Sequence, residues 1–156
     1  MYIDKYFSLE DTGVKCLLCP NNCLISSGNS GFCGVRINKN GKLFLKTYGR
    51  ISCASFDPIE KKPLYHFYPN KDIFSIGTIG CNLKCSFCQN NEISQNTNAD
   101  YLTEVTSAEL YKLSLKNNNN IGIAFTYNEP LIAFEFIYDT AKLFVENNKK
   151  TVIVSN

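Results

Sequence analysis

The chain has 156 residues, of which 44% are hydrophobic, and this suits a single domain with a real core. Its net charge of only +2 gives no reason to expect binding to nucleic acid or to an anionic membrane. No apolar run approaches the ~20 residues that span a bilayer, and the N-terminus lacks the apolar segment of a secretory signal. Eight cysteines without such a signal favour the cytoplasm, and metal binding over disulfides.

The first 40 residues are rich in cysteine, glycine and asparagine and show little hydrophobic periodicity. Four cysteines form a C-x2-C-x3-C-x9-C arrangement there, namely Cys16, Cys19, Cys23 and Cys33. Thiolates so close together can bind structural zinc or an auxiliary iron-sulfur cluster, and the spacing leaves both open. The alternative is a set of free buried thiols, which this close spacing disfavours.

Residues 42–48 mix aromatic and aliphatic side chains between glycines, which predicts a strand or one arm of a hairpin. A loop follows, punctuated by Pro58, Pro63 and Pro69. Cys53 stands alone, and we interpret it as a small packed residue. Glu60, Lys61 and Lys62 have the character of a solvated loop. We therefore treat residues 1–72 as a cysteine-rich N-terminal region.

From residue 73 the pattern changes to apolar runs separated by helical periodicity, and we treat 73–156 as a second, α/β unit. Buried strands are predicted over 73–78, 121–126 and 151–155. Helices are predicted to start at Thr106, with Glu109 as its capping-box partner, and at Pro130, which suits a first helical turn. The order of elements implies parallel strands with helical crossovers.

Three further cysteines follow the first of these strands in a C-x3-C-x2-C arrangement: Cys81, Cys85 and Cys88. Three thiolates can hold three irons of a cubane cluster and leave the fourth iron to another ligand, whereas a closed electron-transfer cluster usually has four cysteines. A structural zinc site would need a fourth ligand, and no histidine lies nearby. Because parallel strands place functional loops at their carboxyl ends, this loop is expected beside residues 127–130 and 155–156.

The C-x3-C-x2-C spacing, with the aromatic Phe87 before its last cysteine, resembles that of radical S-adenosylmethionine (SAM) enzymes. The chain further resembles the radical SAM proteins of the AmmeMemoRadiSam-system type, which are similar to pyruvate formate-lyase-activating enzymes. Four passages carry this resemblance: Cys16 to Arg36, Asp57 to Phe67, Ser75 to Asn90, and Thr126 to Pro130. It implies an α/β fold, the first half of a partial (β/α)6 barrel preceded by the small cysteine-rich region.

The resemblance also implies a site. Cys81, Cys85 and Cys88 correspond to the ligands of the family's [4Fe-4S] cluster, and Phe87 counts with the cofactor-binding residues. The activating enzymes have Gly-Gly-Glu-Pro where this chain has Tyr-Asn-Glu-Pro at 127–130, so Glu129 and, more weakly, Asn128 correspond to SAM-binding positions. The alternative for Glu129 is that it only caps the following helix.

The implied activity is reductive cleavage of SAM to a 5'-deoxyadenosyl radical, which takes a hydrogen atom from a substrate. An electron donor such as flavodoxin or ferredoxin is expected as a partner; the substrate stays open, a protein among the candidates. The chain ends directly after an apolar strand, which leaves a strand edge unprotected, so we expect a truncated or split chain. The alternatives to this activity are a truncated, non-catalytic module that binds an iron-sulfur cluster or zinc, and half of a split enzyme.

Overall fold

The cysteine-rich N-terminal region is built from short antiparallel strands. The computed structural model describes residues 2–3 and 5–156. Its first elements are β1 (Tyr2–Ile3), β2 (Phe7–Glu10), β3 (Gly13–Cys16), β4 (Leu24–Ile25), β5 (Arg36–Lys39) and β6 (Lys42–Leu45). They form two three-stranded sheets, in the orders β2-β3-β4 and β1-β6-β5. The strand predicted over 42–48 is confirmed as β6, which ends three residues earlier.

The predicted proline-punctuated loop contains a strand that joins the main sheet. β7 (Arg50–Ile51) is followed by β8 (Cys53–Pro58) and by a short 3-10 helix, η1 (Ile59–Lys61). β8 pairs antiparallel with β9 (Asp72–Gly77) over its full length. Cys53 is exposed at the start of this edge strand, so its interpretation as a packed residue was wrong.

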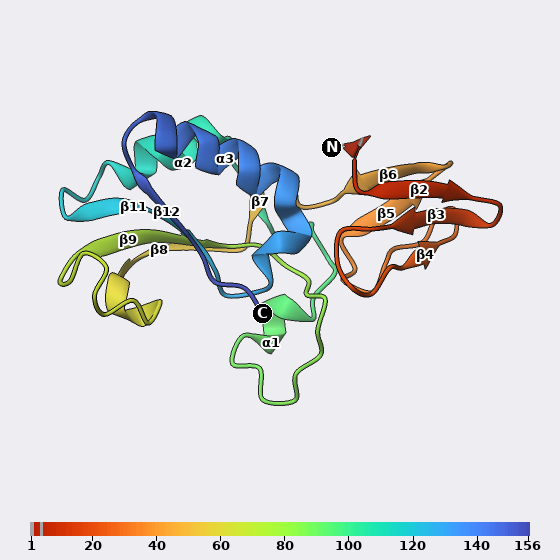
Figure 1. Ribbon diagram of the computed structural model, residues 1–156, viewed down its shortest axis with the longest axis horizontal. Helices are drawn as coiled ribbons and strands as arrows, with labels where there is room; N and C mark the ends of the chain where they lie inside the picture. Colours follow the sequence, from red (N-terminus) through yellow and green to blue (C-terminus); the bar gives the residue numbers. More distant parts are fainter. Residues whose placement is uncertain (1, 4) are drawn as a thin grey trace.

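The rest of the chain forms an α/β layer. Its elements are α1 (Asn91–Ser94), β10 (Thr103–Glu104), α2 (Ser107–Ser114), β11 (Asn120–Phe125), η2 (Pro130–Ala133), α3 (Phe134–Glu146) and β12 (Lys150–Ile153). The sheet order is β12-β11-β9-β8, and β11 pairs in parallel with both β9 and β12. β10 pairs separately with β7. The three predicted parallel strands are therefore confirmed within a mixed α/β fold (Figure 1).

Local signals set the starts of both crossover helices. The hydroxyl of Thr106 accepts a hydrogen bond from the Glu109 backbone amide at 3.2 Å, and Glu109 Oε2 accepts one from the Thr106 amide at 2.8 Å. This confirms the predicted capping box, which satisfies amides that the first helical turn leaves unpaired. Pro130 stands in the first turn of η2, as predicted, because its missing amide hydrogen and fixed φ fit that position.

Alternation along the strands separates the two faces of the sheet. Phe74, Ile76, Ile123 and Phe125 point towards α2 and α3, where they pack on Leu110, Phe136, Ile137 and Phe144. α2 and α3 cover this face in Figure 1. The intervening residues Ile73 and Ala124 belong to a different cluster with Ile59, which follows β8. Side chains at Asp57 and Ser75 share this second face, away from the helices.

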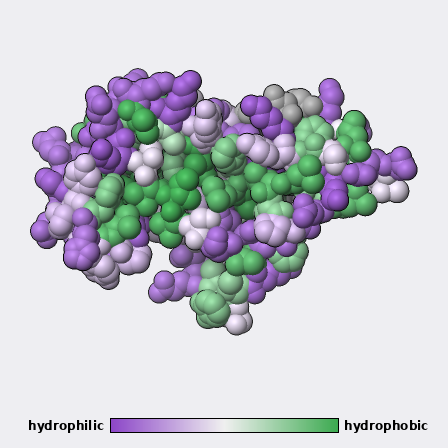
Figure 2. All heavy atoms as spheres, viewed as in Figure 1, coloured by the Kyte–Doolittle hydropathy of each residue, from purple (hydrophilic) through white to green (hydrophobic). Residues whose placement is uncertain are grey.

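The N-terminal region packs directly onto the α/β layer. One buried cluster combines Val14, Ile25 and Leu43 with Ile79 and Ile132. Figure 2 shows hydrophobic residues in a band across the middle of the molecule, with hydrophilic residues around it. None of the helices within residues 2–3 and 5–156 is long and apolar enough to cross a membrane.

Candidate functional site

The three cysteines of the second motif lie on one loop at the carboxyl end of β9. The strand ends at Gly77, and Cys81, Cys85 and Cys88 follow before α1. The Cys88 amide donates to the Cys85 carbonyl at 3.2 Å, which places these two residues in one turn. Cys85 is exposed, whereas Cys81 and Cys88 are half-buried, and all eight cysteines of the chain are free thiols.

The Cys81 thiol lies between its own loop and the loop after β11. Burial raises the pKa of Cys81, while the backbone amides of Leu83 and Glu129 act in the opposite direction. The Leu83 amide donates to Cys81 Sγ at 3.4 Å. The Cys88 Sγ lies 3.3 Å from the hydroxyl of Ser94, in α1. The loops after β9 and β11 therefore meet at Cys81, as expected for neighbouring parallel strands.

Glu129 caps η2 and also gathers the loop after β12. Its Oε1 accepts a hydrogen bond from the Leu131 amide at 2.8 Å, so Glu129 does cap η2, and its correspondence to a SAM-binding position stays a prediction. The same carboxylate accepts from the Ser155 hydroxyl at 3.0 Å and from the Asn156 amide at 3.0 Å. Glu129 is only 4% exposed, which means that a buried acidic group stands at the carboxyl edge of three adjacent strands.

Asn128 bridges the loops after β9 and β11. Its amide nitrogen donates to the Thr78 hydroxyl and to the Gly80 carbonyl, each at 2.9 Å. Its Oδ1 accepts from the Thr78 backbone amide at 3.1 Å. Both polar ends of this side chain are used to join the segment before Cys81 to the segment before Glu129.

A hollow of about 250 Å³ opens beside Glu129. It is bounded by the N-terminal cysteine loop, the Cys81 loop, η2 and the end of the chain. Its lining residues are Leu18, Cys19, Pro20, Asn21, Asn82, Leu83, Glu129, Leu131, Ile132, Ser155 and Asn156. The hollow therefore combines an apolar wall with a carboxylate and several amides, which is the usual make-up of a small-molecule site.

The donor set fits the cluster that the resemblance implies. Three thiols on one loop can supply three sulfur ligands, and that loop contains no acidic or histidine side chain. Within residues 2–3 and 5–156, no three cysteine, histidine or acidic side chains are gathered closely enough to hold a metal ion. Binding a cluster there would require the loop to bring its three sulfurs closer together. Phe87 is 87% exposed and points away from the core.

The four N-terminal cysteines surround one small apolar hollow. Cys16, Cys19, Cys23 and Cys33 all line it, together with Arg36 and Ile132. Burial raises the pKa values of Cys16 and Cys33. The structure thus brings together all four predicted thiols, although not as a ready metal site in the part of the chain that it describes.

The N-terminal cysteine loop touches the loop after β9 at Gly80. Gly80 has a φ of +83°, and a Cβ there would collide with the carbonyl oxygen of Cys33. Only glycine suits this position, because it lacks a Cβ and tolerates the left-handed region. The two cysteine motifs are thereby in backbone contact one residue before Cys81.

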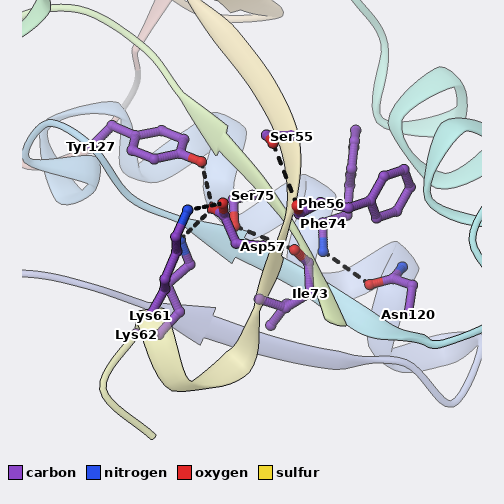
Figure 3. Close-up of polar contacts among 10 residues, drawn as sticks. All are labelled: Ser55, Phe56, Asp57, Lys61, Lys62, Ile73, Phe74, Ser75, Asn120 and Tyr127. Atoms are coloured by element: carbon purple, nitrogen blue, oxygen red, sulfur yellow. Dashed lines mark hydrogen bonds and ion pairs between the residues drawn. The ribbon is translucent and has the colours of Figure 1, made fainter. Parts of the chain in front are cut away.

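A buried polar cluster that the sequence did not predict lies on the face of the sheet opposite the helices (Figure 3). Asp57 Oδ2 accepts hydrogen bonds from Lys62 Nζ at 2.8 Å and from the Tyr127 hydroxyl at 2.6 Å, and Asp57 Oδ1 accepts from Lys61 Nζ at 3.2 Å. Lys62 is buried, so its interpretation as part of a solvated loop was wrong, whereas Lys61 is exposed. No local sequence pattern indicates this cluster, because Asp57 and Tyr127 are 70 residues apart.

In this cluster one carboxylate, that of Asp57, faces the two ammonium groups of Lys61 and Lys62. Burial by itself raises the pKa of Asp57, but hydrogen bonds from Lys62, Tyr127, Ser75 and Lys61 outweigh it and hold the pKa well below its usual range. Burial and the bond to Asp57 raise the pKa of Tyr127. Asp57 is therefore a carboxylate and Tyr127 a neutral hydrogen-bond donor at ordinary pH.

Two comparisons with known proteins gave matches. A sequence model described as the Radical SAM superfamily matches residues 75–156. An uncharacterized protein of Methanocaldococcus jannaschii is 41% identical over 152 residues, a match that covers 97% of this chain. The chain spans only 45% of the length of that relative. No solved structure gave a significant match.

Proposed function

This chain belongs to the radical SAM superfamily, and we propose that it reductively cleaves SAM at a [4Fe-4S] cluster held by Cys81, Cys85 and Cys88. The observation that carries the proposal is the meeting of two loops at the carboxyl edge of the sheet. There the Cys81 thiol lies beside the backbone amide of Glu129. A cluster with three thiolate ligands leaves one iron for the cofactor, and the acidic hollow lies next to it.

In this proposal the protein binds and orients the two cofactors. When bound, they would supply the cleavage chemistry, in which one electron from the external donor breaks a carbon–sulfur bond of SAM and gives methionine and a 5'-deoxyadenosyl radical. Glu129 would accept hydrogen bonds from the amino group of SAM, and Asn128 would hold the two loops at a fixed separation. The apolar residues Leu83 and Leu131 would limit the access of water to the hollow.

Glu129 must exchange partners to take this role. Its carboxylate already accepts bonds from Leu131, Ser155 and Asn156. An ammonium group is a stronger partner for a carboxylate than a neutral hydroxyl or amide, because the hydrogen bond is charge-assisted. The amino group of the cofactor would therefore displace Ser155 and Asn156 from the Glu129 carboxylate. The hydrogen bond from the Leu131 amide would stay as the helix cap.

We place the chain among radical SAM proteins of the AmmeMemoRadiSam-system type, similar to pyruvate formate-lyase-activating enzymes, as the first half of a partial (β/α)6 barrel. The support is the Asp57–Phe67 passage together with Tyr-Asn-Glu-Pro at 127–130. The substrate class, a protein among the candidates, and the donor, a flavodoxin or ferredoxin, are part of the same proposal. They concern the whole protein, since the relative is more than twice as long as the match.

The N-terminal region is proposed to carry a second metal. Cys16, Cys19, Cys23 and Cys33 face one hollow, and four thiolates suit either zinc or an auxiliary iron-sulfur cluster. In the division proposed from the sequence, this region covers residues 1–72 and the radical SAM core covers 73–156. Metal analysis of a variant in which Cys81, Cys85 and Cys88 are replaced by serine separates zinc from iron at these four positions.

Anaerobic reconstitution of the 156-residue chain tests the main proposal. Iron and sulfide are quantified, the EPR spectrum of the reduced protein is recorded with and without SAM, and 5'-deoxyadenosine is measured under dithionite. We expect a [4Fe-4S] signal that changes on addition of SAM, and release of 5'-deoxyadenosine. Serine replacement of Cys81, Cys85 or Cys88 should abolish the SAM-dependent change of the signal, whereas Cys53→Ser is the matched control for an exposed thiol outside the motif.

The outcomes separate the proposal from its rivals. A cluster that ignores SAM and releases no 5'-deoxyadenosine identifies a metal-binding module without catalysis. Activity that appears only when a second polypeptide is added identifies half of a split enzyme. Iron content that is unchanged when all three motif cysteines are replaced would contradict the assignment of the cluster to this loop.

A further inference from the structure

The Asp57, Lys62 and Tyr127 cluster has no assigned role, although it contains the most deeply buried lysine–carboxylate contact among the described residues. Side chains of Lys62 and Asp57 are only 4% and 8% exposed. Burying a charged pair costs desolvation energy that its attraction often fails to recover. A buried ionic cluster is therefore weak support for stability and calls for another explanation.

The backbone conformation of Tyr127 supplies an explanation for this buried cluster. Its φ is +73°, in the left-handed region, which is unusual for a residue with a bulky aromatic side chain. Such a conformation costs of order 1–3 kcal/mol and persists only where the surroundings determine it. The strained residue stands directly before Asn128 and Glu129 in the chain.

Both ends of the Tyr127 side chain are fixed. Its hydroxyl donates to Asp57 at 2.6 Å, and the Lys62 ammonium lies 5.0 Å from the centre of its ring. The ring also lies against β9, because a Cβ at Gly77 would be 3.0 Å from Tyr127 Cδ2. Asp57 is itself held by β8, where it pairs with Ile73. The ring is thus anchored to both β8 and β9, although it belongs to the loop after β11.

We propose that Asp57 and Lys62, acting through Tyr127, are positioning residues that set the course of the Asn128–Glu129 turn. The inference rests on the proposed function, in which that turn meets SAM. A turn that leaves β11 in a left-handed conformation brings the Asn128 side chain onto Thr78 and Gly80 and the Glu129 carboxylate into the hollow. Without the hydroxyl bond, the strained φ at residue 127 loses one of its determinants, and the turn samples other conformations.

The inference also gives a role to Lys62 rather than to Lys61. Lys62 contributes a buried ammonium that keeps Asp57 ionised, so that the carboxylate accepts from the tyrosine hydroxyl. Lys61 reaches the other oxygen of Asp57 from solvent, with a side chain that is 66% exposed. An exposed ion pair of this kind contributes little, so the role assigned here belongs to Lys62.

The test uses Tyr127→Phe, which removes only the hydroxyl, and a control with the same chemistry elsewhere. Tyr48 donates to Asp139 Oδ2 at 2.6 Å, the same distance, but on the helix side of the molecule. Hydrogen–deuterium exchange is measured for the wild type, Tyr127→Phe and Tyr48→Phe without cofactors. Thermal unfolding of each protein is recorded in parallel, and SAM affinity is then measured on the reconstituted proteins.

We expect faster exchange confined to residues 126–133 in Tyr127→Phe, with β9 unchanged and with no such effect in Tyr48→Phe. Loss of one charge-assisted hydrogen bond should weaken SAM binding about tenfold while the iron content stays at the wild-type level. Unchanged exchange over 126–133 overturns the inference, and so does exchange that rises equally throughout the sheet, since a merely structural cluster would do that. If the wild type binds no SAM, the proposed function fails, but the exchange comparison still decides the positioning role.

Discussion

Replacing Arg36 with methionine removes the charged link between the N-terminal region and α3 while keeping most of the side-chain volume. Arg36 is 1% exposed. Its Nε donates to the Ile132 carbonyl at 2.9 Å, and its two terminal nitrogens donate to the two oxygens of Glu135 at 3.1 and 2.6 Å. The substitution leaves this carboxylate, which is 12% exposed, without its partner.

The expected loss in the free energy of unfolding is large because the Glu135 carboxylate keeps its charge without a partner. Removing one member of a buried ion pair costs about 3–5 kcal/mol, and we take the lower end because Glu135 keeps some contact with solvent. With a urea m-value of about 2 kcal/mol/M for a chain of this size, a loss of about 3 kcal/mol lowers the midpoint by roughly 1.5 M. Urea unfolding followed by circular dichroism measures this shift.

The matched control is Arg50→Met. Arg50 binds Glu104 at the same 2.6 Å, but the two side chains are 37% and 75% exposed, and an exposed pair contributes about 0–1 kcal/mol. Adding Glu135→Leu to Arg36→Met removes the stranded charge, so the double variant should regain part of the lost stability. The reasoning is refuted if Arg36→Met lowers the urea midpoint no more than Arg50→Met does.

Three further changes test other parts of the structure. Gly122→Ala places a Cβ against the Lys150 carbonyl oxygen; it should cost about 1–3 kcal/mol and lower the melting temperature, and an unchanged value would show that β12 can shift. Thr106→Ala removes the capping hydroxyl of α2 and should cost about 1 kcal/mol in urea unfolding, whereas no loss would mean that Glu109 caps the helix alone. Asp57 has a folded-state pKa below its unfolded value of about 3.9, so it stabilises the fold above that pH and this contribution is lost as pH falls further. Stability of Asp57→Asn should therefore depend less on pH between about 4 and 2 than that of the wild type, and parallel acid unfolding curves for the two proteins would argue against the role of Asp57.

Sequence patterns predicted the elements whose signals are local. Apolar runs predicted β9, β11 and β12. The capping box at Thr106 predicted the start of α2, and Pro130 predicted the start of η2. The meeting of the Cys81 and Glu129 loops followed from the parallel order of the strands alone. These features depend on residues that are neighbours in the chain or on a general rule of sheet topology.

The features that sequence reasoning missed depend on contacts between distant residues. β8 reads Cys-Ala-Ser-Phe-Asp-Pro, with three exposed residues at its start, so it lacks the alternation of a buried strand and is formed only by pairing with β9. The buried position of Lys62 could not be predicted either, because a lysine beside prolines usually lies in solvent. Its burial depends on Asp57 and on Tyr127, which is 65 positions further along (127 − 62 = 65).

The contact between Gly80 and the Cys33 carbonyl has a consequence for how the chain can be divided. The family model begins at residue 75, yet the loop that carries Cys81 is shaped against a carbonyl from a segment more than 40 residues before that point. A fragment that starts at residue 73 would lose that template, together with β8 and the Arg36 link. The cysteine-rich region therefore helps to shape the loop that carries Cys81, and the two should be expressed, purified and reconstituted together as one chain.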